Sequence, residues 1–287
     1  MNNPNLKVLT LNKNRIKFFG VDYFANFYNG SHETFKYFAS SIDELMIYHD
    51  EMVSFNQYKY ELFKMEIRNI EEKSIVGFFQ NPDIYQDLDS IEFILEDLKK
   101  CELGLFLETN SDKILNDLKA LKEFQKSNPL LIAIPINSYQ SIDVSFFDKQ
   151  ANLAAMNKTI HKLTDNNLNV GLVFKPLIPR LNDEVEELEK IIDKANSLNV
   201  NFIYPSFTLY FDSYKLKNFY DIIEKERSEL KNFYFDKYGQ KFRWESQNLK
   251  ELKKVLVFNS KKNKIKYAMK DIINLYRDDT YTQLKLF

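Results

Sequence analysis

Three neighbouring residues, Ser31-His32-Glu33, bring together a hydroxyl, an imidazole and a carboxylate, which are the groups of a hydrolytic triad. Residues that are adjacent in sequence do not form a triad because they are neighbours, and no oxyanion-hole pattern accompanies them. The remaining histidines, His49 and His161, make no close pair and no HExxH arrangement with His32. We therefore predict neither a nucleophilic triad nor a metal site from these residues.

A second group of polar residues follows the apolar run Ser74–Phe79, which is predicted to be a buried strand. It comprises Asp83, Tyr85, Gln86 and Asp89. One interpretation is structural, with Asp87 or Asp89 capping the next helix. The other is a small-ligand pocket, in which a helix N-terminus would favour an anionic group.

The third chemical feature is a lysine-rich stretch, Lys250–Lys270, in which eight lysines face one acid, Glu251. A solvated helical face explains such a stretch. Contact with a phosphate backbone through Lys261, Lys262 and Lys264 is the functional alternative.

Composition excludes several classes of protein. In 287 residues, 40 Lys and Arg balance 41 Asp and Glu, so the net charge of -1 excludes a globally basic nucleic-acid coat. A single cysteine excludes a disulfide framework, a cysteine-based zinc site and a self-sufficient iron–sulfur cluster. With 6 glycines the chain carries neither GxGxxG nor GxxxxGK[ST], so no glycine-rich phosphate loop is predicted.

No membrane association is predicted from the hydropathy pattern. The N-terminal residues lack a basic region followed by an apolar stretch, as a signal peptide would have. The longest aliphatic run, Leu130–Ile136, is far shorter than the roughly 20 residues that span a bilayer. We expect a cytoplasmic protein.

Short apolar runs alternate with amphipathic ones along the first 210 residues. The predicted strands are Phe18–Tyr28, Ser74–Phe79, Leu103–Leu107, Leu130–Ile136, Val170–Phe174 and Val200–Tyr204. The predicted helices are Leu88–Lys99, Asp112–Lys126 with Ser111 as N-cap, Ala151–Asn166, and one that Asn182 or Asp183 caps and that ends at Ser197. This alternation predicts an α/β fold with a parallel sheet covered by helices. Periodicity leaves a doubly wound sheet and a partial barrel both open, and residues 211–287 are predicted to be mostly helical.

The loop after the first strand, Asn26–Ala39, resembles the first loop of the spore photoproduct lyase family of radical S-adenosylmethionine enzymes. Asn26, Tyr28, Gly30 and Tyr37 fall in register with that family's pattern. The positions of its three cysteines correspond to Ser31, Phe35 and Phe38 here.

Downstream segments keep the same register. They are Asp83-Ile-Tyr85-Gln86, Thr109-Asn110-Ser111, Asn116-Asp117-Leu118, Pro176-Leu-Ile-Pro-Arg180-Leu-Asn-Asp183 and the terminal Gln283-Leu-Lys-Leu-Phe287. The resemblance implies a partial (β/α)6 barrel, similar to a TIM barrel and of the radical-SAM type, over residues 1–210. A helical C-terminal region, residues 211–287, would pack on it.

The departures from the family pattern concern the cofactors that the resemblance implies, a 4Fe–4S cluster and S-adenosylmethionine. Phe35 and Phe38 have no donor atom for iron, and Ser31 offers only a hard oxygen. Cys101 precedes the third strand, at the end opposite the loops, so it cannot replace the lost ligands. Charged residues of the family are also replaced here, by Asn110, Asn116 and Met156.

We therefore expect a protein without iron–sulfur cluster, metal or radical chemistry, in a binding, scaffolding or regulatory role, with nucleic acid or a protein as partner. One alternative is a nucleic-acid-binding protein that uses the basic C-terminal region. Another is an enzyme of a different type that reuses the barrel mouth. The residues expected around such a residual pocket are Asn26, Tyr28, Tyr37, Asp83, Tyr85, Gln86, Thr109 and Asn110.

Overall fold

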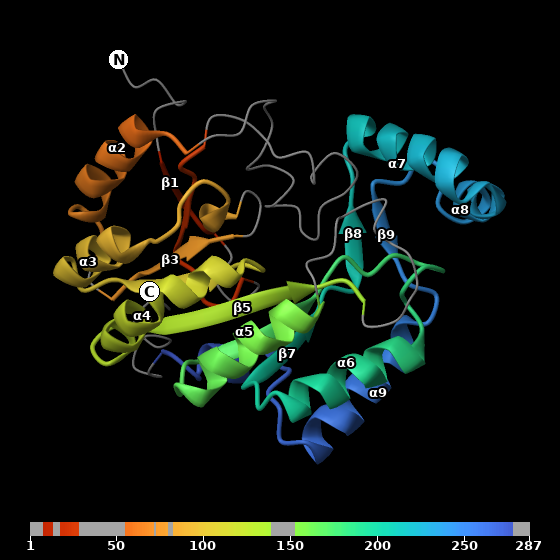
Figure 1. The fold of residues 1–287 in the computed structure, drawn as a ribbon. Helices are drawn as coiled ribbons and strands as arrows, with labels where there is room; N and C mark the ends of the chain where they lie inside the picture. The colour runs from red at the N-terminus through yellow and green to blue at the C-terminus, as the bar shows by residue number, and fades with distance from the viewer. Residues whose placement is uncertain are drawn as a thin grey trace, which may run out of the picture.

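A computed structural model describes residues 8–13, 18–28, 55–71, 73–79, 83–138 and 153–277. Its centre is a 7-stranded sheet in the sequential order β1-β2-β3-β4-β5-β6-β7 (Figure 1). Strands β2 to β7 pair in parallel, and β1 pairs with β2 in antiparallel register. The strands are β1 Leu9–Leu11, β2 Tyr23–Ala25, β3 Ile75–Phe78, β4 Gly104–Glu108, β5 Leu130–Ile136, β6 Val170–Phe174 and β7 Phe202–Pro205.

Helices follow the parallel strands and cover the outer face of the sheet (Figure 1). They are α2 Gln57–Ile67, α3 Glu92–Lys100, α4 Leu118–Gln125, α5 Leu153–Asp165 and α6 Val185–Ser197. Two 3-10 helices, η4 Ile84–Gln86 and η5 Asp112–Asp117, lie in the loops after β3 and β4. The sequential strand order distinguishes this fold from a doubly wound sheet, in which the order reverses at a switch point. The α/β prediction and the partial barrel that the resemblance implied are confirmed.

Both faces of the sheet are buried, which explains why its strands are continuous apolar runs. Leu105, Leu107 and Ile132 belong to the cluster that joins the strands to the surrounding helices. Residues of opposite parity, such as Phe106 and Leu131, belong to a second cluster on the inner face. Because side chains alternate along each strand, every strand contributes residues to both clusters.

Aromatic side chains fill the inner cluster. The ring of Phe19 stacks on that of Phe106, with centroids 4.7 Å apart, and packs edge-on against Tyr204 at 5.1 Å. Gly171 leaves room for the ring of Phe202, since a Cβ atom at this glycine would lie 2.2 Å from that ring. At the amino ends of the strands the cluster is closed by helix α10, Met269–Ile273, and by Tyr276.

The C-terminal region adds a small unit of its own. Its elements are β8 Thr208–Tyr210, α7 Ser213–Glu226, η6 Ser228–Leu230, α8 Lys231–Lys237, β9 Arg243–Glu245 and α9 Leu249–Lys262. Strands β8 and β9 form an antiparallel pair, and α7 and α8 lie beside them (Figure 1). Helix α9 instead packs on α6. The region is thus mostly helical, as predicted, with one strand pair that the sequence did not indicate.

A separate aromatic cluster holds this unit together and links it to the barrel. Trp244 stacks on Tyr238, with ring centroids 4.5 Å apart, and on Tyr234 at 5.4 Å. The hydroxyl of Tyr234 donates to the carbonyl of Pro179 at 2.5 Å, and Ser246 Oγ donates to Asp183 Oδ2 at 2.5 Å. The loop between β6 and α6 therefore anchors the C-terminal unit.

Two of the predicted helix caps are wrong. Helix α6 has Glu184 at its N-cap. Asn182 Nδ2 instead donates to the carbonyl of Pro176 and to that of Asn137 after β5, and Asp183 Oδ1 accepts from the amide of Arg180. Because Asn182 is fully buried, its amide satisfies backbone groups that water cannot reach. The predicted N-cap Ser111 is confirmed, since its side chain accepts from the amide of Lys113.

Neither Asp87 nor Asp89 caps α3. Asp87 Oδ2 accepts from the amide of Phe55 at 2.6 Å, and Asp89 pairs with Lys113 at 2.9 Å. The carboxylate of Asp117, distant in sequence, accepts from the amide of Ile91 at the start of α3 at 2.9 Å.

None of the helices in the described ranges is both long and apolar enough to cross a membrane.

Candidate functional site at the carboxyl ends of the strands

Asp83, directly before η4, is the centre of a polar network that links the loops after β2, β3 and β4. Its Oδ2 accepts from Thr109 Oγ1 at 2.6 Å and from the amide of Asn110 at 3.2 Å. Its Oδ1 accepts from the amide of Tyr85 at 3.0 Å, and its backbone carbonyl accepts from the hydroxyl of Tyr28 at 3.2 Å. The structure thus brings together four residues expected at this mouth from sequence: Tyr28, Asp83, Thr109 and Asn110.

Burial of Asp83 raises the pKa of its carboxyl, and the hydrogen bonds from Thr109, Tyr85 and Asn110 oppose that rise. Each of these donors stabilises the ionised carboxylate more than the neutral acid. The carboxylate of Asp83 therefore serves as an acceptor for its own loop and for the loop after β4 rather than as an exposed acid.

Tyr85 lies away from the mouth. Its side chain is 1 % exposed, and its hydroxyl donates to Asp117 Oδ2 at 2.8 Å. Burial, together with the charge of Asp117, raises the pKa of Tyr85 well above its ordinary value. Tyr85 and Asp117 thus tie η4 to η5 and to the start of α3, which is a structural role.

The other expected pocket residues are dispersed. Asn26 Oδ1 accepts from the amide of Tyr28 at 2.9 Å, and Gln86 is exposed on η4. Tyr37 and the three positions aligned with the cluster cysteines, Ser31, Phe35 and Phe38, lie outside the described residues.

Sequence reasoning missed a buried ion pair inside the same rim. Lys175 Nζ lies 2.6 Å from Glu108 Oε1, with side-chain exposures of 9 % and 2 %. Glu108 ends β4 and Lys175 follows β6, so the pair bridges these strands across β5. Glu108 has the parity of Phe106 and Lys175 that of Val173, which places both on the inner face. The two residues are distant in sequence, so no local motif indicates them.

Asn137 follows β5 at the same rim. Its side chain is buried, and its Oδ1 has no hydrogen-bond partner among the residues that the structure describes. A buried amide oxygen without a partner costs free energy that a hydrogen-bonding ligand or loop would recover. The Asn137 amide oxygen is therefore the group at this rim that a polar ligand or loop could engage, since Glu108 and Lys175 pair with each other.

The lysines proposed to contact nucleic acid lie at the other end of the barrel. Lys261 and Lys262 end α9, and Lys264 follows it in a left-handed conformation with φ 58°. Two residues further, Lys266 pairs with the amino end of β7 through Phe202. Lys261, Lys262 and Lys264 are all exposed. A ligand on these lysines and one at the mouth would occupy opposite ends of the molecule.

Replacing Asp83 by alanine should lower the free energy of unfolding by about 1–3 kcal/mol, because three donors would lose their shared, half-buried acceptor. Urea unfolding of the variant measures the loss. Tyr28→Phe is the matched control, since it removes one hydrogen bond to the Asp83 backbone and leaves the carboxylate network intact. Equal stability of Asp83→Ala and the parent would contradict this account of the network.

The sequential strands and the helices that follow them define a class of fold, an α/β partial barrel. Among solved structures, the chain is similar to spore photoproduct lyase complexed with dinucleoside spore photoproduct, with a TM-score of 0.59, 14% identity, and coverage of 90% of this chain and 76% of that one. A variant of the same enzyme with bound AdoMet and dinucleoside spore photoproduct matches with a TM-score of 0.58 at 14% identity over the same shares. No family model matches the chain, and neither does any curated protein. At this identity the likeness establishes the fold.

The donor set of this chain does not fit the three-thiolate cluster of radical-SAM enzymes. The sequence has one cysteine, Cys101, which follows α3 and precedes the amino end of β4. Burial raises the pKa of its thiol, which disfavours the thiolate form that binds metal. His161 is the one histidine among the described residues, and its Nδ1 lies 3.0 Å from Asp165 Oδ1 on the exposed side of α5.

Proposed function

We propose that this chain keeps the radical-SAM scaffold without its radical chemistry and acts by binding, in a scaffolding or regulatory role. The observation that carries the proposal is that its one cysteine lies at the amino end of β4, the wrong end of the barrel for a loop-bound cluster. Three thiolates are required to hold a cluster of this type. The aligned positions offer Ser31, Phe35 and Phe38 instead.

The polar network at the mouth supports the same conclusion. The carboxylate of Asp83 accepts bonds from three loop residues, and Glu108 and Lys175 pair with each other. Side chains that satisfy one another in this way preserve the shape of a loop-lined mouth without a cofactor to organise it. A stable mouth is a suitable surface for a ligand or a partner.

Anaerobic reconstitution with iron and sulfide tests the proposal. We expect the parent protein to retain far less than one iron per chain and to form no 5′-deoxyadenosine from S-adenosylmethionine under reducing conditions. Iron in cluster stoichiometry together with 5′-deoxyadenosine formation would overturn the proposal.

Two variants make that result interpretable. Cys101→Ala should leave the iron content unchanged, because this thiol is remote from the loops. A triple variant, Ser31→Cys with Phe35→Cys and Phe38→Cys, restores the CxxxCxxC spacing and should gain iron if the alignment is correct. Iron uptake by the parent but not by Cys101→Ala would show that Cys101 is a ligand after all.

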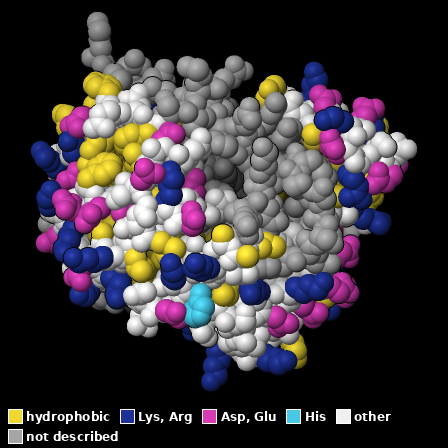
Figure 2. Space-filling view, in the orientation of Figure 1, with side chains coloured by type: hydrophobic (Ala, Val, Ile, Leu, Met, Phe, Trp, Pro, Cys, Tyr) yellow, Lys and Arg dark blue, Asp and Glu magenta, His cyan; other side chains and the backbone are white. Residues whose placement is uncertain are grey.

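Nucleic-acid binding is a second candidate, favoured by the exposure of Lys261, Lys262 and Lys264 and by the absence of ion pairs between them and other described residues. Figure 2 shows one face of the molecule, where basic and acidic side chains are interspersed, so a basic site would be local. Reversing these charges with three Lys→Glu substitutions should abolish salt-dependent binding of a short DNA or RNA duplex. Absence of binding by the parent at low salt would exclude this function.

A further inference from the structure

Helices α6 and α9 pack on each other on the outer surface of the barrel and together form one face of the molecule (Figure 1). Asn259 Nδ2 of α9 donates to Glu189 Oε1 of α6 at 3.3 Å, so these two residues mark the boundary between the helices. The buried sides of both helices belong to the barrel cluster, through Leu188, Ile191, Ile192, Leu252 and Leu256. Their other sides are exposed.

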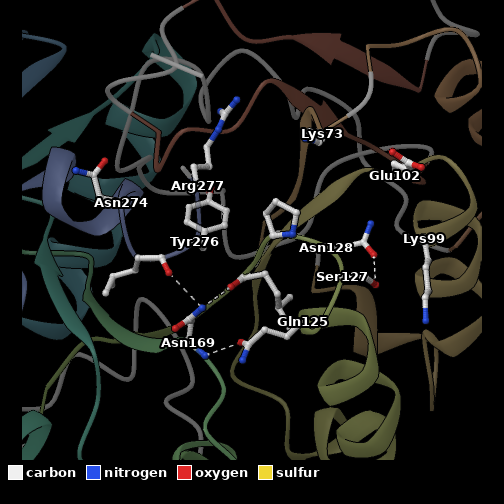
Figure 3. Close-up of a pocket in the computed structure, with 13 residues that line it drawn as sticks. Lys73, Lys99, Glu102, Gln125, Ser127, Asn128, Asn169, Asn274, Tyr276 and Arg277 are labelled. Carbon is white, nitrogen blue, oxygen red and sulfur yellow. Dashed lines mark hydrogen bonds between the residues drawn. The ribbon is translucent and has the colours of Figure 1, made fainter. Parts of the chain in front are cut away.

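Helix α9 is anchored before its start and after its end, so its exposed side is a fixed surface. Before the helix, Asn248 Nδ2 donates to the carbonyl of Asp183 at 3.4 Å. After α9 and α10 the chain returns to the barrel, where Asn169 Nδ2 donates to the carbonyl of Leu275 at 3.4 Å (Figure 3). A surface held in this way loses little conformational entropy when a partner binds to it.

The exposed side of α9 is basic. It carries five exposed lysines and one acid, Glu251. No ion pair joins any of the five lysines to another described residue. They are Lys250, Lys253, Lys254, Lys261 and Lys262.

Phe258 lies in the middle of this basic side. Its side chain is 70% exposed, more than that of any other large hydrophobic residue in the described ranges, and the neighbouring Val257 is exposed as well. Lys254 comes four residues before Phe258 and Lys261 three residues after it, so both lie next to its ring on the helix surface. Aromatic side chains are enriched in protein interfaces relative to the rest of the protein surface.

Helix α6 presents the opposite charge beside this basic side. Glu186, Glu189 and Asp193 are exposed and follow one another at spacings of three and four residues, so they form one acidic stripe along the helix. Because Glu189 contacts Asn259, the stripe borders α9. The face formed by α6 and α9 therefore has an acidic side and a basic side, with an exposed aromatic ring on the basic side.

The lysines of α6 lie on its far side. Lys190 and Lys194 follow Glu187 by three and seven residues, which places all three on one stripe of the helix. Glu187 accepts from Ser138 Oγ after β5 at 2.8 Å, so this stripe is turned towards β5 and away from α9. These lysines therefore do not neutralise the acidic stripe beside α9.

We propose that the face formed by α6 and α9 binds the same face of a second copy of this chain, in a dimer with two-fold symmetry. A two-fold axis in the plane of the face, along the boundary between the helices, brings the basic side of each copy opposite the acidic side of the other. Such an interface uses the same patch on both copies. Charge complementarity favours a second copy over nucleic acid or an anionic membrane, because the acidic stripe of α6 would repel either of them.

The size of the face predicts a weak dimer. Two helices of 13 and 14 residues give a face about 20 Å long and about 20 Å wide. This corresponds to the lower end of the areas that specific complexes bury. We therefore expect reversible association that weakens as salt screens the charges. The proposal is independent of whether the mouth holds a cofactor, because the face lies on the outside of the barrel.

Sedimentation equilibrium of the full chain at low ionic strength, over a range of protein concentrations, tests the proposal. We expect a monomer–dimer equilibrium that shifts towards the monomer as salt is added. The double variant Lys254→Glu with Lys261→Glu should raise the dimer Kd about tenfold or more, because each substitution acts twice in a two-fold dimer. Phe258→Ser should also raise the Kd, and its circular dichroism should match that of the parent because the ring is exposed.

An exchange of charges provides the sharpest comparison. Glu186→Lys with Asp193→Lys should weaken the dimer as the lysine variants do, and combining all four substitutions should restore it, because the acidic and basic sides are then exchanged. Lys217→Glu with Lys237→Glu is the matched control: it makes the same change of charge at exposed positions of α7 and α8, in the C-terminal unit (Figure 1). Its Kd should stay within about twofold of the parent value.

The proposal is overturned if the parent is monomeric at low salt at every concentration, if the control variant raises the Kd as much as Lys254→Glu with Lys261→Glu, or if the fourfold variant does not recover the dimer. A parent that stays monomeric and binds a DNA or RNA duplex, or vesicles of anionic lipid, through Lys254 and Lys261 would also overturn it. The face would then bind a different anionic partner.

Discussion

Replacing Arg277 by methionine should lower the free energy of unfolding by about 3–5 kcal/mol, because it removes the cation beside a buried carboxylate. Asp22 is 0% exposed, and its Oδ2 accepts from the amide of Ile75 at 2.7 Å and pairs with Arg277. Arg277 Nη1 also donates to the carbonyl of Gly20. The arginine thus holds the segment after α10 against the start of β2. Urea unfolding, followed by circular dichroism, measures the loss.

A double variant separates the charge effect from simple loss of packing. Adding Asp22→Asn to Arg277→Met removes the buried carboxylate charge while keeping an oxygen that can accept from Ile75. The double variant should therefore be more stable than Arg277→Met alone. If Arg277→Met lowers the free energy of unfolding by less than about 1 kcal/mol, the pair contributes no more than a surface ion pair does and this account is wrong.

At the opposite end of the barrel, Lys175→Met should also cost about 3–5 kcal/mol, since Glu108 would stay buried without its ammonium partner. The methionine preserves most of the side-chain volume, so the loss would reflect charge rather than a cavity. Thermal unfolding at neutral pH provides the measurement.

Removing both charges gives the control. Glu108→Met combined with Lys175→Met should recover a large part of the lost stability, because buried ion pairs replaced by apolar residues of similar volume are often neutral in stability. A double variant as unstable as Lys175→Met would show that the lysine stabilises the rim through contacts other than Glu108. If the double variant is stable but has lost a ligand that the parent binds, the pair serves binding rather than folding.

The parallel strands could be predicted from sequence because each is a short, continuous apolar run bounded by turn residues. Helix α2 was not predicted: its buried residues Tyr60, Phe63 and Ile67 form a narrow stripe, and the exposed Tyr58 and Met65 obscure the period. Both are among the exposed large hydrophobic residues of the described chain, and Figure 2 shows a hydrophobic area over α2. Strand β1, of three residues, is too short for alternation to be recognised.

Contacts between distant segments explain what the sequence did not indicate at the functional site. The polar loop residues Asp83 and Thr109 could be expected together, since both follow neighbouring parallel strands. The pairs Glu108–Lys175 and Asp22–Arg277 have no local spacing rule, because register between strands and the return of the C-terminal segment create them. The two wrong predictions of helix caps have the same origin. Asp117, distant in sequence, accepts from the amide of Ile91 at the start of α3, and Ser246 from the C-terminal unit donates to Asp183.

The position of Trp244 has a consequence for how unfolding is observed. It is the chain's one tryptophan, and it lies in the aromatic cluster of α7, α8 and the β8–β9 pair, a cluster separate from both barrel clusters. Tryptophan fluorescence therefore reports on the C-terminal unit, whereas far-ultraviolet circular dichroism reports mainly on the barrel. Coincident transitions would show that the two cores melt as one cooperative unit. An earlier fluorescence transition would show that the hydrogen bonds of the loop at Pro179 and Asp183 break first and release the C-terminal unit from an intact barrel.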